Sequence, residues 1–155
     1  MLTARPTSYR GIQMRSRLEA HVARWLDTHP SFLPWEYEPT CFAGIAGQYL
    51  PDFVLHHRNF DSYIEVKSHT VREGELEDIM RRMPVIWESQ PRALLAIQLW
   101  DQRRDPPTLV TSLYRGPQRC DVGWSVNLWA VRTATGEPAR FLYSGARHLW
   151  AILDR

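Results

Sequence analysis

The sequence predicts an α/β fold in which helices pack against a mixed β-sheet. The chain has 155 residues, 44% of them hydrophobic, which suits one domain that buries a core without disulfides. A helical pattern is followed by several strand patterns, then by a second helical pattern and further strands. An uninterrupted apolar run at 93–100 is typical of a central strand covered on both faces. This order of elements favours a sandwich of helices around a mixed sheet.

The first elements expected are an arm, a helix and a short strand. Residues 1–10 lack periodicity, so we expect a flexible N-terminal arm ahead of a single domain at 11–155. Apolar residues then recur at helical spacing until a His-Pro pair ends the run, which predicts a helix over about 11–28. The segment WEYE at 35–38 lies between prolines and alternates as a short strand does.

A β-hairpin is predicted next. The runs YLPDFVLHH and SYIEVKS have strand character, and RNFD between them has the residues and length of a hairpin turn. Two registers remain open. A turn centred on residues 58–59 places Asp52 opposite Glu65, and a turn one residue later places it opposite Lys67. In both registers the three charged groups share one face of the sheet.

The second half of the chain is expected to hold two helices and several strands. A helical period runs over about 73–90, where Pro84 must kink the helix or divide it. The buried strand at 93–100 follows. Further strands are expected in TLVTSLY, WSVNLWAV and PARFLYS, with a turn in TATGE, and a short amphipathic helix is expected over about 144–154.

Composition directs attention to a single lysine. The net charge is +2, so the overall field does not require a nucleic-acid partner. Of the 19 basic residues only Lys67 is a lysine, a bias that a GC-rich genome also explains. Arginine replaces lysine at most solvated positions, but not where chemistry needs a compact ammonium group or an amine that loses its proton. Lys67 is therefore the first candidate for a catalytic residue.

Cysteine usage and hydropathy indicate the compartment. Cys41 and Cys120 form no CxxC pair, so neither a disulfide framework nor a Cys-rich zinc site is expected. No apolar run approaches the roughly 18 residues that a membrane helix needs, and residues 1–20 have no stretch of signal-peptide type. We therefore expect a cytoplasmic protein without a membrane partner.

The combination of Asp52, Glu65 and Lys67 on one face of the sheet indicates a type of reaction. Carboxylates a few ångströms apart repel each other in a low-dielectric setting unless a cation lies between them. Oxygen ligands suit Mg²⁺, with Mn²⁺ as a substitute. An adjacent ammonium group orients or helps to deprotonate the attacking water and stabilises negative charge in the transition state. This combination fits phosphodiester hydrolysis.

Two motifs carry a resemblance to known nucleases. PDF, a dozen residues and EVK resemble the signature of the PD-(D/E)XK nuclease superfamily, here Pro51, Asp52, Glu65, Val66 and Lys67. The RSxxE pattern of Arg15, Ser16 and Glu19 resembles the first-helix motif of phage junction-resolving endonucleases and TnsA-type transposon end-cleaving endonucleases. The resemblance covers about residues 12–70, and the rest of the chain agrees only in element order.

The resemblance implies a restriction-endonuclease-like three-layer α/β/α sandwich and a metal-dependent DNA endonuclease. It implies Asp52, Glu65, the carbonyl of Val66 and Glu19 as metal ligands, Glu19, Asp52, Glu65 and Lys67 as catalytic residues, and Arg15 and Ser16 beside the DNA. Branched DNA or mobile-element ends are the implied substrates, in phage DNA recombination or transposition. A homodimer, or a protein from a phage or mobile-element system, is the implied further partner.

Several alternatives remain open. Arg103 and Arg104 form a pair that either grips phosphates or is simply solvated. Arg15 and Glu19 lie on the apolar stripe of the predicted helix, or form an exposed ion pair. The rival function is a catalytically silent nucleic-acid-binding or assembly module with a nuclease fold.

Three further polar residues are weaker candidates. Glu36 and Glu38 lie near the predicted site and either can reach a metal, although edge-strand carboxylates are usually solvated. Gln98 either positions a water molecule or is a satisfied core amide.

Overall fold

The computed structural model describes residues 4–28, 33–45, 47–117, 123–132 and 136–153. The strands are β1 (Thr7–Tyr9), β2 (Ile12–Met14), β3 (Trp35–Tyr37), β4 (Phe42–Gly44), β5 (Gly47–Tyr49), β6 (Phe53–His56), β7 (Asp61–Ser68), β8 (Leu94–Asp101), β9 (Thr108–Arg115), β10 (Ser125–Arg132) and β11 (Pro138–Leu142). The helices are α1 (Arg17–Thr28), α2 (Glu73–Arg82), the 3₁₀ helix η1 (Met83–Glu88) and α3 (Ala146–Leu153).

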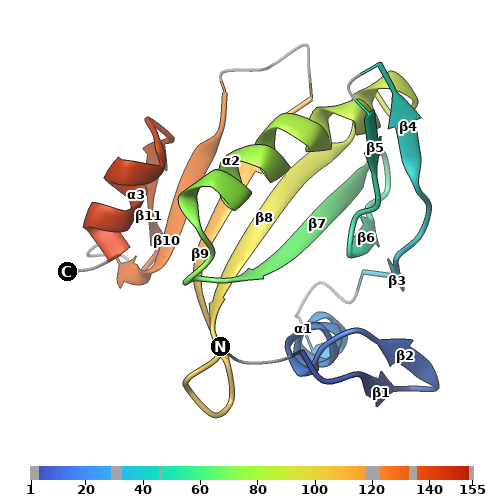
Figure 1. Cartoon of the computed structure of the whole chain (residues 1–155), viewed down its shortest axis with the longest axis horizontal. Coiled ribbons are helices and arrows are strands. Elements are labelled where there is room, and N and C mark those ends of the chain that lie inside the picture. The colour runs from blue at the N-terminus through green and yellow to red at the C-terminus, as the bar shows by residue number, and fades with distance from the viewer. Residues whose placement is uncertain (1–3, 29–32, 46, 118–122, 133–135, 154–155) are drawn as a thin grey trace.

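The fold is mixed α/β, as predicted, and is organised around one large sheet (Figure 1). Its seven strands lie in the order β11-β10-β9-β8-β7-β6-β3. β7 and β8 run parallel and every other neighbouring pair is antiparallel, so the sheet is mixed. β1 pairs with β2, and β4 with β5, in two separate hairpins. β8 has neighbours on both sides and is buried over most of its length, which confirms the predicted central strand.

The register of the β6–β7 hairpin decides how the site residues meet. Phe53 pairs with Ile64, and the N–H of Asp52 donates to the carbonyl of Ile64 at 3.1 Å. One step further along this register, Asp52 lies opposite Glu65. Of the two registers left open by the sequence, this is the one with the turn centred on residues 58–59.

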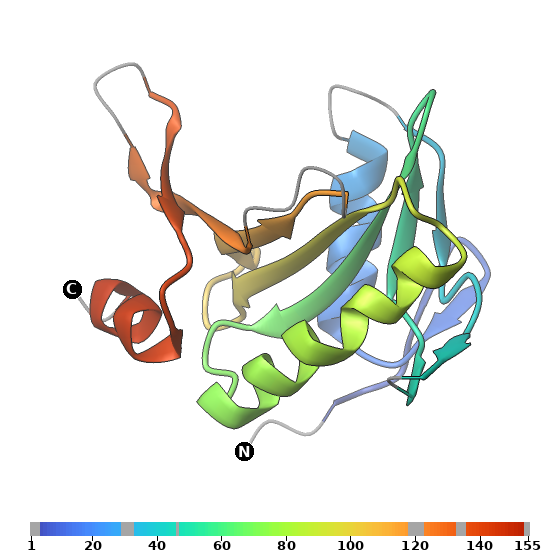
Figure 2. The same cartoon turned by 90° about the horizontal axis from the view of Figure 1, so that it is seen from above.

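Helices lie on both sides of the sheet. α2 and η1 bury Leu76, Ile79 and Ile86 in a cluster with Leu95 and Ile97 of β8. The helix predicted over 73–90 is divided at its proline, since the α-helix ends at Arg82 and a 3₁₀ helix follows. Figure 2 shows this helical segment lying along the sheet, with β11 and α3 at the end of the sheet remote from β3.

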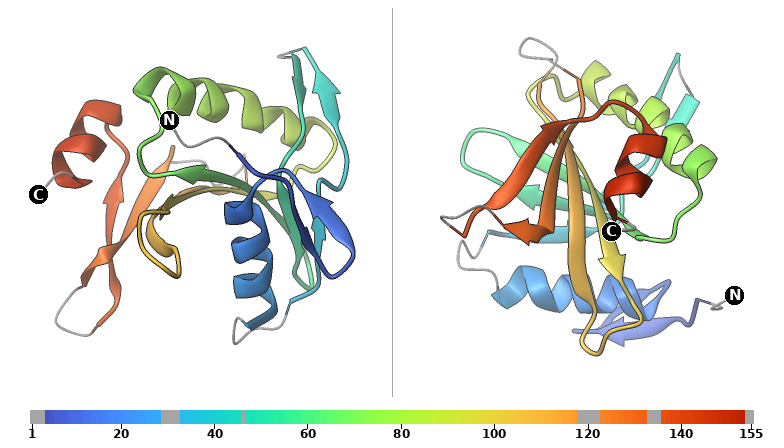
Figure 3. Two further views of the ribbon diagram at one scale, coloured as in Figure 1. Left: turned by 60° about the horizontal axis from the view of Figure 1, so that its bottom comes forward. Right: turned by 90° about the vertical axis from the view of Figure 1, so that its left-hand side faces the viewer.

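α1 packs against the opposite face. Leu18, Val22 and Leu26 are buried with Phe53 and Ile64, in a cluster separate from that of α2. Figure 3 shows α1 and α2 on opposite sides of the sheet. Successive side chains of β7 point to opposite faces of the sheet. Tyr63 therefore belongs to the cluster under α2, and Ile64 to the cluster under α1.

The N-terminal segment corrects the first predicted helix. Helix α1 begins at Arg17, so the start expected near residue 11 is wrong. The preceding residues form the β1–β2 hairpin, whose turn at Arg10 and Gly11 has positive φ angles of 48° and 78°. The segment expected as a flexible arm thus contains β1, and Tyr9 donates a hydrogen bond to Asp27 of α1. Strands of three residues are too short to produce a recognisable period.

The remaining predicted strands are found as β9, β10 and β11, and the terminal helix as α3. Parts of the predicted pattern lie outside the described residues, namely the His-Pro pair at 29–30, Cys120 and most of the TATGE turn. None of the helices in the described part of the chain has the length and apolar character of a membrane-spanning helix.

Candidate functional site

Ser16 fixes the start of α1. Its hydroxyl oxygen accepts a hydrogen bond from the N–H of Glu19 at 3.1 Å, and the hydroxyl donates to Glu19 Oε1 at 3.3 Å. This is the side-chain cap expected from a Ser-x-x-Glu sequence at a helix N-terminus. The motif resemblance implied that Ser16 lies beside DNA. In the structure its side chain caps α1. The cap also sets the direction in which the first turn presents Glu19.

Glu19 is buried at the first turn of α1, with 8% of its surface exposed. Tyr37 of β3 donates its hydroxyl hydrogen to Glu19 Oε2. Burial, and then the hydrogen bond to Glu19, raise the pKa of Tyr37 above its usual value. The phenol consequently stays protonated and remains a donor that holds this carboxylate in place.

Asp52 is 2% exposed and is held from two sides. Its Oδ2 accepts the N–H of Val66 at 2.7 Å, and its Oδ1 accepts Nη2 of Arg15 at 2.7 Å. Burial, and then the neighbouring charge of Glu65, raise the pKa of Asp52 well above its usual range, although the Val66 N–H and Arg15 act in the opposite direction. A further cation near Oδ1 would therefore stabilise the ionised form.

Glu65 faces Asp52 from β7 and is also buried. Tyr49 of β5 donates its hydroxyl hydrogen to Glu65 Oε2. Burial raises the pKa of Glu65, while the Tyr49 hydrogen bond and the charge of Lys67 lower it. Burial and Glu65 together raise the pKa of Tyr49 well above its usual value, so this phenol also remains a donor.

Lys67 lies two residues beyond Glu65 on the same strand. Its Nζ is 3.8 Å from Glu65 Oε1 and 3.2 Å from Oε1 of Glu75 on α2. The ammonium group is thus held between β7 and α2, at the edge of the buried carboxylates. Its side chain remains 31% exposed, which leaves the group accessible to solvent and to a bound molecule.

Arg15 joins several acidic groups that are far apart in the sequence. Besides the contact with Asp52, its Nε is 2.8 Å from Glu38 Oε1 and 3.9 Å from Glu19 Oε1. Glu38 Oε1 is itself buried, and none of the described N–H or O–H groups donates a hydrogen bond to it. We call Glu19, Glu38, Asp52 and Glu65 the carboxylate cluster.

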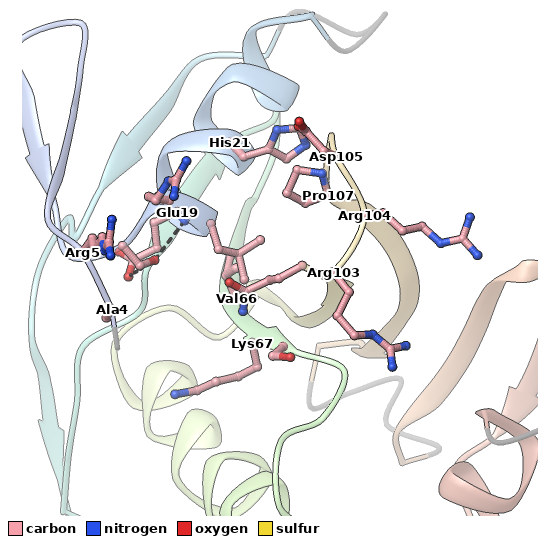
Figure 4. A pocket seen from close by; sticks show the side chains of 15 residues that line it. Ala4, Arg5, Glu19, His21, Val66, Lys67, Arg103, Arg104, Asp105 and Pro107 are labelled. Atoms are coloured by element: carbon pink, nitrogen blue, oxygen red, sulfur yellow. Dashed lines mark hydrogen bonds between the residues drawn. The ribbon is translucent and has the colours of Figure 1, made fainter. Parts of the chain in front are cut away.

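A cleft of about 920 Å³ opens beside the carboxylate cluster (Figure 4). Its lining includes Ser16, Glu19, Val66, Lys67, Arg103 and Arg104 among the residues singled out from the sequence, together with Arg5, Arg17 and His21. Figure 4 shows Val66 and Lys67 between Glu19 on one side and the two loop arginines on the other. Asp52 and Glu65 are buried and do not belong to the lining. The rim of the cleft is therefore mainly basic.

The loop between β8 and β9 presents the two arginines in a fixed arrangement. Asp101 is buried and accepts the backbone N–H and Nε of Arg103 at 3.0 and 3.1 Å. Nε of Arg104 lies 3.6 Å from the same carboxylate, and Nη2 of Arg103 is 3.1 Å from Nε2 of His69. These contacts orient the loop, while both guanidinium groups remain largely exposed at the rim.

The weaker candidates separate from the site. Oε1 of Gln98 accepts the indole N–H of Trp100 at 3.1 Å, and Gln98 is 4% exposed, so it is a satisfied core amide. Glu36 pairs with His56 at 2.6 Å on the exposed edge of the sheet. Glu38 follows β3, outside the strand predicted to contain it, and of the two acids only Glu38 belongs to the carboxylate cluster.

The donor chemistry of the cluster fits a hard divalent cation. Asp52 Oδ1 and Glu65 Oε1 are the oxygens not engaged by a backbone N–H or a tyrosine, and each faces a cationic side chain instead. In the described part of the chain, no three His, Cys, Asp or Glu side chains are grouped as a complete metal cage. Mg²⁺ usually binds proteins through one or two carboxylates and keeps several waters, so this pair fits such an ion.

Tyr37 and Tyr49 were not predicted as site residues. Their only sequence signal is that each is a polar aromatic residue in a short strand, with Tyr37 between Glu36 and Glu38 and Tyr49 three residues before Asp52. Burial beside a carboxylate gives a tyrosine hydroxyl a partner that it needs, but the pairing depends on tertiary packing.

The candidate site thus combines buried carboxylates, the cations Arg15 and Lys67, and a cleft with a basic rim. Such an arrangement is suited to a divalent cation and an anionic substrate. No protein-family model, curated protein or solved structure matches this chain.

Proposed function

We propose that this protein is a Mg²⁺-dependent DNA endonuclease that hydrolyses phosphodiester bonds. The observation that carries the proposal is the pairing of buried Asp52 and Glu65 across the β6–β7 hairpin, with the only lysine of the chain 3.8 Å from Glu65. Buried like charges are costly unless a cation compensates them. The motif resemblance to PD-(D/E)XK nucleases supports the same reading of these residues.

The proposal includes a restriction-endonuclease-like three-layer α/β/α arrangement. It is supported by α1 and α2 lying on opposite sides of a mixed sheet. The position of the site also supports it. Asp52 and Glu65 lie on the β6–β7 hairpin, and β7 also pairs in parallel with β8. In this arrangement the first helix supplies Glu19, β7 supplies Glu65, and Asp52 directly precedes β6.

Each residue then has a distinct task. Asp52, Glu65 and the carbonyl of Val66 would hold Mg²⁺, which when bound neutralises substrate charge and lowers the pKa of water. Glu19 would bind a second metal ion or orient a metal-bound water. Lys67 donates hydrogen bonds to the attacking water or to a phosphate oxygen. Glu75 holds the ammonium group of Lys67 in position from α2.

The tyrosines and the basic rim complete the site. Tyr37 and Tyr49 keep Glu19 and Glu65 oriented, each through one carboxylate oxygen. Arg103 and Arg104 contact phosphates of the DNA backbone away from the reacting bond, without reading sequence. Specificity for branched DNA or for mobile-element ends would then depend on the shape of the substrate.

A cleavage panel tests the proposal. Purified protein is incubated with labelled linear duplex, single strand, nicked duplex and four-way junction, each with Mg²⁺, Mn²⁺ or EDTA. We expect cutting of at least one substrate with metal, no cutting in EDTA, and loss of cutting in Asp52→Asn. Cutting in EDTA would contradict the proposal, and binding to every substrate without cutting would favour the catalytically silent module.

A further inference from the structure

We propose that Arg15 is the resident counter-ion of the carboxylate cluster, and that a divalent metal displaces it and frees its guanidinium group for a substrate phosphate. The inference rests on the proposed function, because it concerns the same carboxylates. It adds a coupling between metal binding and nucleic-acid binding that passes through one side chain.

Competition follows from the contacts of Asp52. One of its oxygens, Oδ2, is engaged by the backbone N–H of Val66 at 2.7 Å. The other, Oδ1, is bound by Nη2 of Arg15 at 2.7 Å. A cation that binds Asp52 through Oδ1 therefore competes with Arg15 for the same oxygen. Two positive groups on one buried oxygen repel each other, so binding of one weakens binding of the other.

The position of Arg15 allows it to leave. Its side chain is 62% exposed, whereas the side chain of Asp52 is 3% exposed, so the guanidinium group approaches the acid from the solvent side. The backbone of Arg15 is fixed independently, since its N–H donates to the hydroxyl oxygen of Tyr37 at 3.1 Å. The side chain can therefore rotate outward without disturbing the packing of α1.

Departure of Arg15 without a replacement is unfavourable. It would leave the buried acid Asp52 and the buried oxygen of Glu38 without their nearest cation. Removing one partner of a buried ion pair is strongly destabilising. The exchange is therefore favourable only when another cation reaches the cluster, which ties the movement of Arg15 to metal binding.

The released group has a suitable destination. Arg15 does not itself line the cleft, but the next residue, Ser16, does, so the cleft is close to the freed guanidinium group. Guanidinium groups bind phosphate oxygens in a bidentate manner. Metal binding thereby adds a phosphate contact, and by thermodynamic reciprocity nucleic-acid binding raises the affinity for metal.

Calorimetric titration with Ca²⁺ tests the competition. Wild type is compared with Arg15→Gln and with Arg24→Gln, which removes an exposed arginine of α1 that does not line the cleft. We expect Arg15→Gln to bind Ca²⁺ about 5- to 10-fold more tightly, a coupling of ordinary size between two sites, and Arg24→Gln to resemble wild type. Equal or weaker Ca²⁺ binding by Arg15→Gln would overturn the inference. Arg15→Lys, which keeps the charge but not the bridge to Glu38, is the second variant and is expected to give an intermediate affinity.

The coupling is measured by fluorescence anisotropy with labelled duplex DNA, with and without Ca²⁺. Ca²⁺ is expected to raise the affinity of wild type for DNA, and to raise that of Arg15→Gln several-fold less. The same enhancement in both proteins would overturn the role of Arg15 at the phosphate.

The Asp52→Asn variant distinguishes failure of the metal site from failure of the displacement of Arg15. Ca²⁺ binding that Asp52→Asn abolishes but Arg15→Gln does not tighten overturns only the displacement of Arg15. Absence of Asp52-dependent Ca²⁺ binding in wild type removes the metal site of the proposed function, and the displacement falls with it.

Discussion

Tyrosine hydroxyls hold two of the buried acids of the candidate site. Tyr37 donates to Glu19 and Tyr49 to Glu65, each at Oε2. A phenol satisfies one carboxylate oxygen without neutralising the group, so the other oxygen stays available to a cation. At Asp52 the backbone N–H of Val66 has this role, because it donates to Oδ2 and leaves the charge of the carboxylate in place. At the scale of single residues, the site is therefore oriented but not electrically compensated, except by Arg15 and Lys67.

Replacement of Asp52 by asparagine is expected to stabilise the metal-free protein at neutral pH. The pKa of Asp52 is raised in the folded state, so folded protein binds more protons than unfolded chain between the ordinary and the raised pKa. Stability consequently falls as pH rises through that window, and a neutral amide removes the fall. We expect Tm in EDTA to rise by about 2–4 °C, equivalent to about 1 kcal/mol in a domain of this size.

Scanning calorimetry of Asp52→Asn at pH 5 and pH 8 checks this prediction. The matched control is Asp78→Asn, which removes an exposed carboxylate paired with arginines on α2 and is not expected to raise Tm. A lower Tm for Asp52→Asn, or an unchanged pH dependence, would show that Arg15 compensates the buried charge fully.

Tyr49→Phe is expected to weaken metal binding while leaving the fold intact. The change removes the hydrogen bond that orients Glu65, and loss of such an outer-shell partner typically lowers metal affinity about 10-fold or more. Titration with Ca²⁺ measures the effect. Tyr143→Phe serves as the control, since that hydroxyl donates to Glu77 outside the site. Equal affinities for wild type and Tyr49→Phe would remove Glu65 from the ligand set.

Among the helices and strands, α1 begins at a different residue from the one that the sequence predicts. The Ser-x-x-Glu spacing that resembles a nuclease motif is also a helix-start signal, and the structure uses it as one. Helical spacing before Ser16 obscures that start, because Ile12 and Met14 belong to a strand of three residues.

Ser16→Ala is expected to act on stability and not on DNA. Loss of an N-cap costs about 1 kcal/mol, which lowers Tm by about 2–4 °C in a domain of this size. The affinity for DNA should stay as in wild type, because the hydroxyl is engaged by Glu19. Ser8→Ala, in the exposed part of β1, is the control. A weaker affinity for DNA would instead return Ser16 to the DNA-binding residues.

The β8–β9 loop gives a second prediction at this scale. Replacing Arg103 and Arg104 together by glutamine should lower DNA affinity and reduce the slope of log Kd against log salt by about 2, since each lost phosphate contact contributes about 0.9. Fluorescence anisotropy at several salt concentrations measures the slope. Arg140 and Arg147 are exposed and do not line the cleft, so their double replacement is the control. An unchanged slope would mean that the loop arginines are simply solvated.

The length of a helix or strand explains whether its sequence pattern could predict it. β7, β8 and α2 have eight to ten residues each and were expected close to their observed bounds. The hairpins β1–β2 and β4–β5 consist of strands of three residues, for which neither alternation nor composition gives a usable signal. Proline was informative where periodicity failed, because it divides the second helix at Pro84.

At the scale of the whole molecule, the site is assembled from segments spread over half the chain. The pairing of Asp52 with Glu65 is local to one hairpin, so sequence reasoning reduced it to two registers. The contacts of Arg15 with Glu38 and Asp52 need α1, β3 and the hairpin to dock together (Figure 1), and no local pattern encodes them. The same holds for Tyr49, which reaches Glu65 from a separate small hairpin.

In the proposed function, Lys67 and the acids beside it carry out metal-dependent phosphodiester hydrolysis. The single-turnover cleavage rate of Lys67→Ala at saturating Mg²⁺, beside wild type and Arg92→Ala, measures this role directly. Arg92 precedes β8, at the opposite end of the β7–β8 pair from Lys67, so its loss removes equal charge remote from the site. We predict that Lys67→Ala binds DNA but cleaves at least about 100-fold more slowly, as expected for loss of a group acting on the nucleophile, while Arg92→Ala cleaves normally. Cleavage by Lys67→Ala within a few-fold of wild type would exclude Lys67 from the catalytic residues.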